Sequence, residues 1–264
     1  MALATLPGPP ATDSDDRDEF EDSSSKMSFL EHLDELRRRL IVAAVAVAGG
    51  FGICMLFIDH IFGFIMRPLT QVLPAGGKLV YTEPAEAFML YMKVAALAGL
   101  VLASPVVLLQ VWLFIAPGLY AREKRFAVPF VAMTTFFFVA GALFSHFVAF
   151  PWTWAFFASF STDYMQFMPK IGPVFSLYAK MLLGFGIIFQ MPTVVFFLAR
   201  FGIISAKWLL RYFKYAVLII FIVAAVISPG TDVVSQLMMA VPMLALYAIS
   251  IIVAALVRPR RARA

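Results

Sequence analysis

Residues 87–116 read AFMLYMKVAALAGLVLASPVVLLQVWLFIA. Lys93 is the one charged residue in this stretch of thirty. A helix needs about 20 predominantly apolar residues to cross the hydrocarbon core of a bilayer. The stretch therefore predicts a transmembrane helix.

Similar apolar segments recur on both sides of this stretch. Together they predict an all-α polytopic membrane protein with six spans, at about 40–58, 87–116, 126–150, 174–199, 213–228 and 233–257. The composition agrees, because 62% of the 264 residues are hydrophobic, 14% are charged and the mean hydropathy is +0.89. These values exclude an ordinary soluble enzyme and a disordered protein.

The fifth predicted span is short. Between Lys214 and Asp232 lie too few residues to cover the hydrocarbon core, which is about 30 Å thick. The membrane around it must thin, or other helices must cover its ends.

Three regions differ in composition. Residues 1–26 are acidic, with prolines and a serine run, and predict a disordered tail. Residues 27–258 form the predicted membrane domain, and 259–264 form a basic tail. The loops 59–86 and 151–173 are rich in proline and aromatic residues and predict ordered caps at the membrane surface.

The distribution of cations predicts the orientation. Four connecting or terminal segments on one side of a six-span arrangement carry fifteen Lys and Arg residues, from Lys26 to Arg263. The opposite loops carry Arg67, Lys78 and Lys170. The positive-inside rule then places both termini in the cytoplasm, in a multi-pass protein of the cytoplasmic membrane.

The sequence offers no pattern for catalysis, for a cofactor or for nucleic-acid binding. No glycine-rich phosphate loop is visible, and the histidines lack metal-ligand spacing. Cys54 is a single thiol in an apolar stretch and predicts a buried hydrophobe. We expect a protein that is not an enzyme and needs no metal or cofactor.

A polar cluster precedes the first span. Ser28 and Glu31 form a capping box, which predicts that a helix starts there. Asp34 and Glu35 lie four residues before Arg38 and Arg39, in the favourable order for helical ion pairs. The cluster is either a set of solvated ion pairs or a carboxylate surface that accepts a cation.

A second acid, Glu123, lies among cations on the same predicted side. It either balances local charge or joins Glu35 in a site with two carboxylates. Such a site would favour a guanidinium group, which forms paired, directional hydrogen bonds to carboxylates that an ammonium group does not reproduce.

Polar side chains within the spans need partners or a function. Lys93 and Lys180 are placed where they can extend to the interface. Asp232 predicts an N-cap for the sixth span. Four polar residues predict either internal packing contacts or a docking point for the polar residue of a partner helix: His146, Gln190, Thr231 and Gln236.

Several of these motifs resemble the TatC family, the receptor subunits of the twin-arginine translocation system. The resemblance covers about 27–257. It rests on His32-Leu33-Asp34-Glu35-Leu36-Arg37-Arg38-Arg39-Leu40, on the run from Ser104 to Tyr120 with Glu123-Lys124-Arg125, and on Pro68, Phe189-Gln190-Met191-Pro192 and Asp232-Val233-Val234-Ser235-Gln236.

The resemblance implies a glove-shaped six-helix bundle and a function in moving folded proteins across a membrane. It implies that Glu35 and Glu123 recognise the Arg-Arg pair of a signal peptide, with Arg37 and Phe114 also at important positions of the signal-peptide site. Pro68 and Asp232 fall on further positions that matter in the family. TatA- and TatB-like single-span proteins, other copies of the chain and the proton-motive force are the implied partners and driving force.

Two residues depart from the family pattern. Many members carry Glu at the position of Gln190, and many carry Tyr at the position of His146. Gln keeps hydrogen bonding but does not ionise, so a neutral polar dock is the expectation at Gln190. The alternative function is a secondary transporter for a small solute, which would predict paired repeats and interrupted helices around a midplane site.

Overall fold

The computed structural model describes residues 14–71, 79–115, 127–162, 164–165, 167–228 and 232–257, with side chains for those from His32 onward except 115, 127 and 128. These residues form helices and connecting loops, as predicted for an all-α membrane protein. Five helical segments are long and apolar enough to cross a bilayer: His32–Leu56, Pro84–Phe114, Pro129–Ala158, Ile171–Arg200 and Val233–Leu256.

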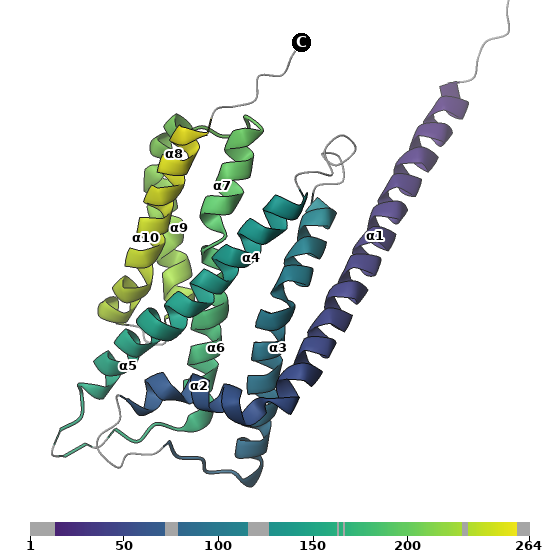
Figure 1. Ribbon diagram of the computed structural model, residues 1–264. Helices are drawn as coiled ribbons and strands as arrows, with labels where there is room; N and C mark the ends of the chain where they lie inside the picture. The colour runs from purple at the N-terminus through teal and green to yellow at the C-terminus, as the bar shows by residue number, and fades with distance from the viewer. Residues whose placement is uncertain are drawn as a thin grey trace, which may run out of the picture.

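The chain passes back and forth through the bundle (Figure 1). Helices α1 (Ser14–Leu56) and α3 (Pro84–Ile115) lie side by side. The third pass combines α4 (Ala127–Phe144), a π-helical turn η2 (Ser145–Ala149) and α5 (Phe150–Ala158). The fourth combines α6 (Ile171–Ile188) and α7 (Met191–Arg200), and α10 (Val233–Leu256) is the last. The start of α1 and the end of α10 lie at the same end of the bundle (Figure 1).

The segment predicted as the fifth span is the short apolar helix α9 (Phe213–Ile227), which follows the six-residue helix α8 (Ala206–Arg211). Its fifteen residues extend about 22 Å at 1.5 Å per residue. The hydrocarbon core is about 30 Å thick. The helix is therefore shorter than each of the five long passes.

Helix α1 begins at Ser14, so the prediction that a helix starts at the capping box of Ser28 and Glu31 was wrong. Residues 14–26, which we expected to be part of a disordered tail, belong to this helix; the rest of that tail and residues 259–264 lie outside the described residues. The segment is acidic in sequence, and negative charge is favourable near a helix N-terminus.

Glycines bring the helices close together. A Cβ atom added to Gly50 of α1 would lie 2.5 Å from the carbonyl oxygen of Gly99 in α3. A Cβ on Gly141 of α4 would lie 2.5 Å from the carbonyl oxygen of Phe185 in α6. Small residues at such crossings let two backbones approach within a membrane, where close van der Waals packing drives association.

The fourth pass is interrupted between α6 and α7. Phe189 and Gln190 form a turn, and Pro192 follows within the first turn of α7. Proline lacks the N–H that would continue the hydrogen-bond ladder, and its ring crowds the preceding turn. The interruption places the Gln190 side chain at the middle of this pass.

Helix α2 (Ile58–Thr70) lies across the end of the bundle far from the start of α1 (Figure 1). One face of α2, including Pro68 and Leu69, is buried. The two predicted cap loops meet here, because Val80 donates its N–H to the carbonyl of Pro169 at 3.1 Å and accepts from Ile171 at 3.0 Å. Backbone pairing thus joins residues that are ninety positions apart.

Candidate functional site

Glu35 lies on α1 near the end of the bundle at which α1 starts and α10 finishes. Its Oε1 atom accepts a hydrogen bond from Nη2 of Arg39 at 3.1 Å, one helical turn further on. The same guanidinium group donates from Nη1 to Oε1 of Gln110 on α3, at 3.3 Å. Arg39 therefore connects the carboxylate to the neighbouring helix and restricts where it points.

The carboxylate remains accessible. The Glu35 side chain is 33% exposed, and it lines an open recess of about 560 Å³ with Arg37, Asp34 and Arg38. A carboxylate has two oxygens and about four sites for accepting hydrogen bonds, and Arg39 contacts Oε1. Glu35 can therefore accept a second guanidinium group while keeping its contact to Arg39.

Phe114 lies at the same end of the bundle, in the last turn of α3. Its ring stacks on the imidazole of His32, with 4.6 Å between centroids and 22° between planes. This contact, like that of Arg39 with Gln110, joins α1 to α3. The structure therefore brings Glu35, Arg37 and Phe114 to one end of a single helix pair, whereas Glu123 lies outside the described residues.

His146 lies in the π-helical turn η2 and is 3% exposed. Its Nδ1 atom is 3.0 Å from the hydroxyl of Tyr178 on α6. Its ring stacks on Phe64 of α2, with centroids 4.2 Å apart. The histidine thus has a polar partner and an aromatic partner inside the bundle.

Gln190 has a different environment. Its amide Nε2 donates to the carbonyl of Thr134 on α4 at 3.0 Å and, less closely, to that of Gly186 at 3.4 Å. Its Oε1 atom is buried and accepts no hydrogen bond from the described residues. An unsatisfied acceptor in an apolar environment is costly. This oxygen is the polar atom of the predicted docking set that lacks a hydrogen-bond partner among the described residues.

Gln236 and Asp232 lie at the start of α10. Nε2 of Gln236 donates to the carbonyl of Phe221 on α9 at 2.9 Å. Asp232 is the N-cap, as predicted: Oδ1 accepts from the N–H of Ser235 at 2.7 Å, and Oδ2 accepts from its hydroxyl at 2.7 Å. These two donors hold the pKa of the Asp232 carboxyl below its usual value. Thr231 lies outside the described residues.

The predicted docking residues therefore do not form one cluster. His146 pairs with Tyr178, Gln190 with Thr134 and Gln236 with Phe221, and these contacts join different pairs of helices. These three residues do not hydrogen-bond to one another, so internal pairing within the set, the alternative to docking, is not observed for them.

Sequence reasoning missed three residues whose hydrogen bonds join distant parts of the bundle: Gln110 at the Glu35 site, Tyr178 beside His146, and Glu86 at the end with α2. Gln110 was overlooked, although an amide inside an apolar span is a signal for an interhelical hydrogen bond. Tyr178 was overlooked because a tyrosine among apolar residues resembles ordinary core. Glu86 was overlooked because its partner, the N–H of Gly172, is distant in sequence. Among the described residues no group of three His, Cys, Asp or Glu side chains could hold a metal ion.

Comparison with known proteins identifies relatives along most of the chain. A family model described as "Sec-independent protein translocase protein (TatC)" matches residues 31–242. A protein of that name from Koribacter versatilis is 46% identical over 240 residues, which cover 90% of this chain and 88% of the relative. One from Desulforapulum autotrophicum is 44% identical over 227 residues, covering 86% and 84%.

A solved structure has the same fold. It is described as "Crystal Structure of Twin Arginine Translocase Receptor- TatC" and superimposes with a TM-score of 0.73 at 34% sequence identity. The match covers 84% of this chain and 97% of that one. The region that the family model matches includes the helix pair with Glu35, the interrupted fourth pass and the start of α10. The chain belongs to the TatC family of Sec-independent protein translocases.

Proposed function

We propose that this chain is the receptor that binds the Arg-Arg motif of twin-arginine signal peptides, on folded cargo proteins, at its cytoplasmic face. Glu35 and Glu123 would accept the two guanidinium groups, with Arg37 and Phe114 beside them. The observation that carries the proposal is the Glu35 carboxylate, which Arg39 and Gln110 orient and which stays one-third exposed in an open recess.

This geometry suits a guanidinium ligand. The preorganised carboxylate loses little side-chain entropy on binding, because Arg39 already restricts it. An arginine forms two parallel hydrogen bonds to a carboxylate, whereas a lysine acts as a point charge. The site would therefore distinguish an Arg-Arg signal from a Lys-Lys signal. The His32–Phe114 stack would supply an apolar surface for the residues of the signal peptide that follow its Arg-Arg pair.

The test is crosslinking of the purified full chain to an Arg-Arg signal peptide and to its Lys-Lys counterpart. Glu35→Gln should reduce crosslinking of the Arg-Arg peptide by about tenfold or more, since hydrogen bonds to charged groups contribute about 1.5–3 kcal/mol. Asp59→Asn is the matched control, because Asp59 is an exposed acid of α2 at the other end of the bundle. Equal crosslinking of wild type and Glu35→Gln, with both folded, would refute the assignment.

We also infer that the protein resides in the cytoplasmic membrane with both termini in the cytoplasm. Arg200, Lys207 and Arg211 lie around α7 and α8, at the same end of the bundle as Glu35 (Figure 1). Arg67 and Lys170 lie at the end with α2. Cations on the cytoplasmic side are favoured by the positive-inside rule.

TatA- and TatB-like single-span proteins, further copies of this chain and the proton-motive force complete the proposed system. A docking role for Gln190 would require the side chains that cover its unsatisfied Oε1 to move, because this atom is buried within the chain; a polar donor of a partner helix would then satisfy it. His146, Thr231 and Gln236 remain part of the proposed docking set. Membership of a protein translocase family sets aside the small-solute transporter that the sequence left open.

A further inference from the structure

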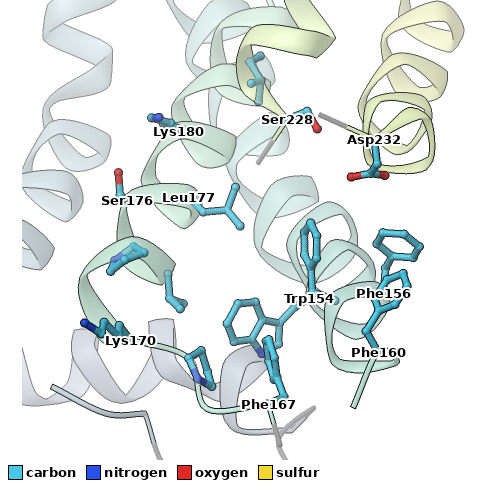
Figure 2. Close-up of a pocket in the computed structure, with 15 residues that line it drawn as sticks. Trp154, Phe156, Phe160, Phe167, Lys170, Ser176, Leu177, Lys180, Ser228 and Asp232 are labelled. Carbon is cyan, nitrogen blue, oxygen red and sulfur yellow. The ribbon is translucent and has the colours of Figure 1, made fainter. Parts of the chain in front are cut away.

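An open recess of about 860 Å³ is shown in Figure 2. The helix ends that bound it lie at the end of the bundle opposite to Glu35 (Figure 1). The recess is bounded by α5, by α6, by the end of α9 and by the start of α10. Most of its lining is apolar, from Trp154, Phe156, Phe157, Phe160, Leu177 and Ile227. The long apolar wall is suited to a hydrocarbon chain.

Three charged groups line the same recess. Lys170, the N-cap of α6, and Lys180 of α6 lie on one side, and Asp232, the N-cap of α10, lies on the other (Figure 2). Asp232 is engaged by both donors of Ser235. Lys180 is exposed, and no carboxylate of the described residues forms an ion pair with it. Lys170 also interacts with the carboxylate of Glu86, so Lys180 is the ammonium group of the recess that has no carboxylate partner among the described residues.

Lys180 is also deep for a charged residue. It lies nine positions after Ile171, the first residue of α6, which places it about 14 Å along the helix. A charged side chain at this depth is costly unless it reaches a partner or the interface. Because α9 is short and ends at Ile227 in this recess, thinning of the adjacent bilayer would bring lipid headgroups toward the level of Lys180.

We propose that the recess binds one anionic phospholipid from the adjacent leaflet. The ammonium group of Lys180 would bind the phosphate, Lys170 would face the headgroup from the membrane surface, and one acyl chain would lie along Phe156, Phe160 and Leu177. The unpaired ammonium group of Lys180 selects a headgroup with net negative charge over a zwitterionic one. This site is separate from the proposed signal-peptide site, and its test does not depend on that function.

The experiment measures lipid binding to the purified, delipidated full chain by native mass spectrometry. Phosphatidylglycerol is titrated into wild type, Lys180→Gln, Lys180→Arg and Lys207→Gln. Lys207 is the matched control, because it is an exposed lysine of α8 at the other end of the bundle. Phosphatidylethanolamine with the same acyl chains and water-soluble glycerol phosphate form the two comparison arms.

We expect Lys180→Gln to weaken phosphatidylglycerol binding about fivefold, the effect of removing one cation from a lipid headgroup. Lys180→Arg should retain phosphatidylglycerol binding, and Lys207→Gln should bind this lipid as wild type does. Phosphatidylethanolamine should bind more weakly to wild type, and glycerol phosphate should not compete with phosphatidylglycerol. Phosphatidylglycerol with brominated chains should also quench Trp154, in a chain whose Trp112, Trp152 and Trp208 are replaced by Phe.

Three results would overturn the proposal. Equal affinity of wild type and Lys180→Gln for phosphatidylglycerol would remove Lys180 from any lipid site. Competition by glycerol phosphate would show a phosphate site without chain recognition. Binding of a single-span helix that bears a carboxylate, with the same dependence on Lys180 and without lipid binding, would assign the recess to a protein partner.

Discussion

Oε1 of Glu86 accepts a hydrogen bond from the backbone N–H of Gly172 at 3.2 Å, although the two residues are 86 positions apart. Oε2 of the same carboxylate accepts from the N–H of Thr82 at 3.0 Å. Glu86 thus holds the loop before α3 against the first turn of α6. Together with the backbone pairing of Val80, it fixes the cap end of the bundle on which the lysine-lined recess is built.

Replacing Glu86 should loosen this cap. We expect Glu86→Ala to lower the Tm of the detergent-solubilised chain, because two backbone N–H donors lose their acceptor. Glu86→Gln should have a smaller effect, since its amide oxygen still accepts one hydrogen bond. Glu83→Ala is the control, an exposed acid three residues earlier. The Tm is measured by heating samples and determining the folded fraction by size-exclusion chromatography. Equal Tm values for Glu86→Ala and Glu83→Ala would contradict a role of Glu86 in holding the cap.

The contact of Gly50 with Gly99 makes α1 sensitive to side-chain size at one position. Gly50→Leu should destabilise the fold by about 1–3 kcal/mol or more, because its Cβ meets backbone that does not rotate away. Gly49→Leu is the matched control, because a Cβ atom added to Gly49 has no neighbour within 4 Å. Unfolding of both variants in dodecyl sulfate gives the comparison. Similar unfolding midpoints would show that α1 and α3 are not in close contact.

The N-cap at Asp232 predicts a dependence of stability on pH. Because the folded-state pKa of Asp232 is lowered, its contribution to stability is present above the unfolded pKa of about 4 and is lost as the pH falls through the folded pKa. The Tm of wild type should therefore decrease on acidification below about pH 4 more than that of Asp232→Asn, which caps without ionising. Parallel Tm profiles for the two proteins would exclude this contribution.

Docking at Gln190 should require an acceptor and not a charge. Gln190→Leu removes the oxygen that lacks a partner among the described residues, whereas Gln190→Glu retains an acceptor at that place. We expect copurification of a single-span TatA- or TatB-like partner to fall several-fold with Leu and to fall less with Glu. If the well-folded Leu variant retains the partner at the wild-type level, Gln190 is not a docking residue.

Cysteine labelling tests the orientation. In a background with the buried Cys54 replaced by Ala, Asp59→Cys should react with an impermeant reagent in intact cells. Lys207→Cys should react only after lysis, because α8 lies at the end that carries the clustered cations. The reverse pattern would invert the proposed topology.

Hydropathy along the chain was sufficient to locate the five long passes, but not all of their ends. The first long apolar helix begins at His32 and not near residue 40, and the third continues to Ala158 and does not end near residue 150. A span is defined by local composition, because each backbone polar group of a membrane helix is satisfied within the segment. This is why 174–199 was anticipated as one pass although α6 and α7 are interrupted at Gln190, and why the short α9 was recognised. The same local reasoning failed at Ser28, where a plausible capping box lies inside a longer helix.

Contacts between distant residues were decided by packing alone. The sequence suggested Glu35 as an acceptor, but its orientation by Arg39 depends on Gln110, which is 71 positions from Arg39. His146 and Gln190 were equivalent as polar residues in apolar spans. Tyr178 satisfies the first, whereas the Oε1 of the second is left without a described donor. Such differences arise from the depth, rotation and spacing of neighbouring helices, which no local sequence pattern encodes. Gly50 and Gly141 contribute to this spacing, because each allows close contact with the backbone of a neighbouring helix.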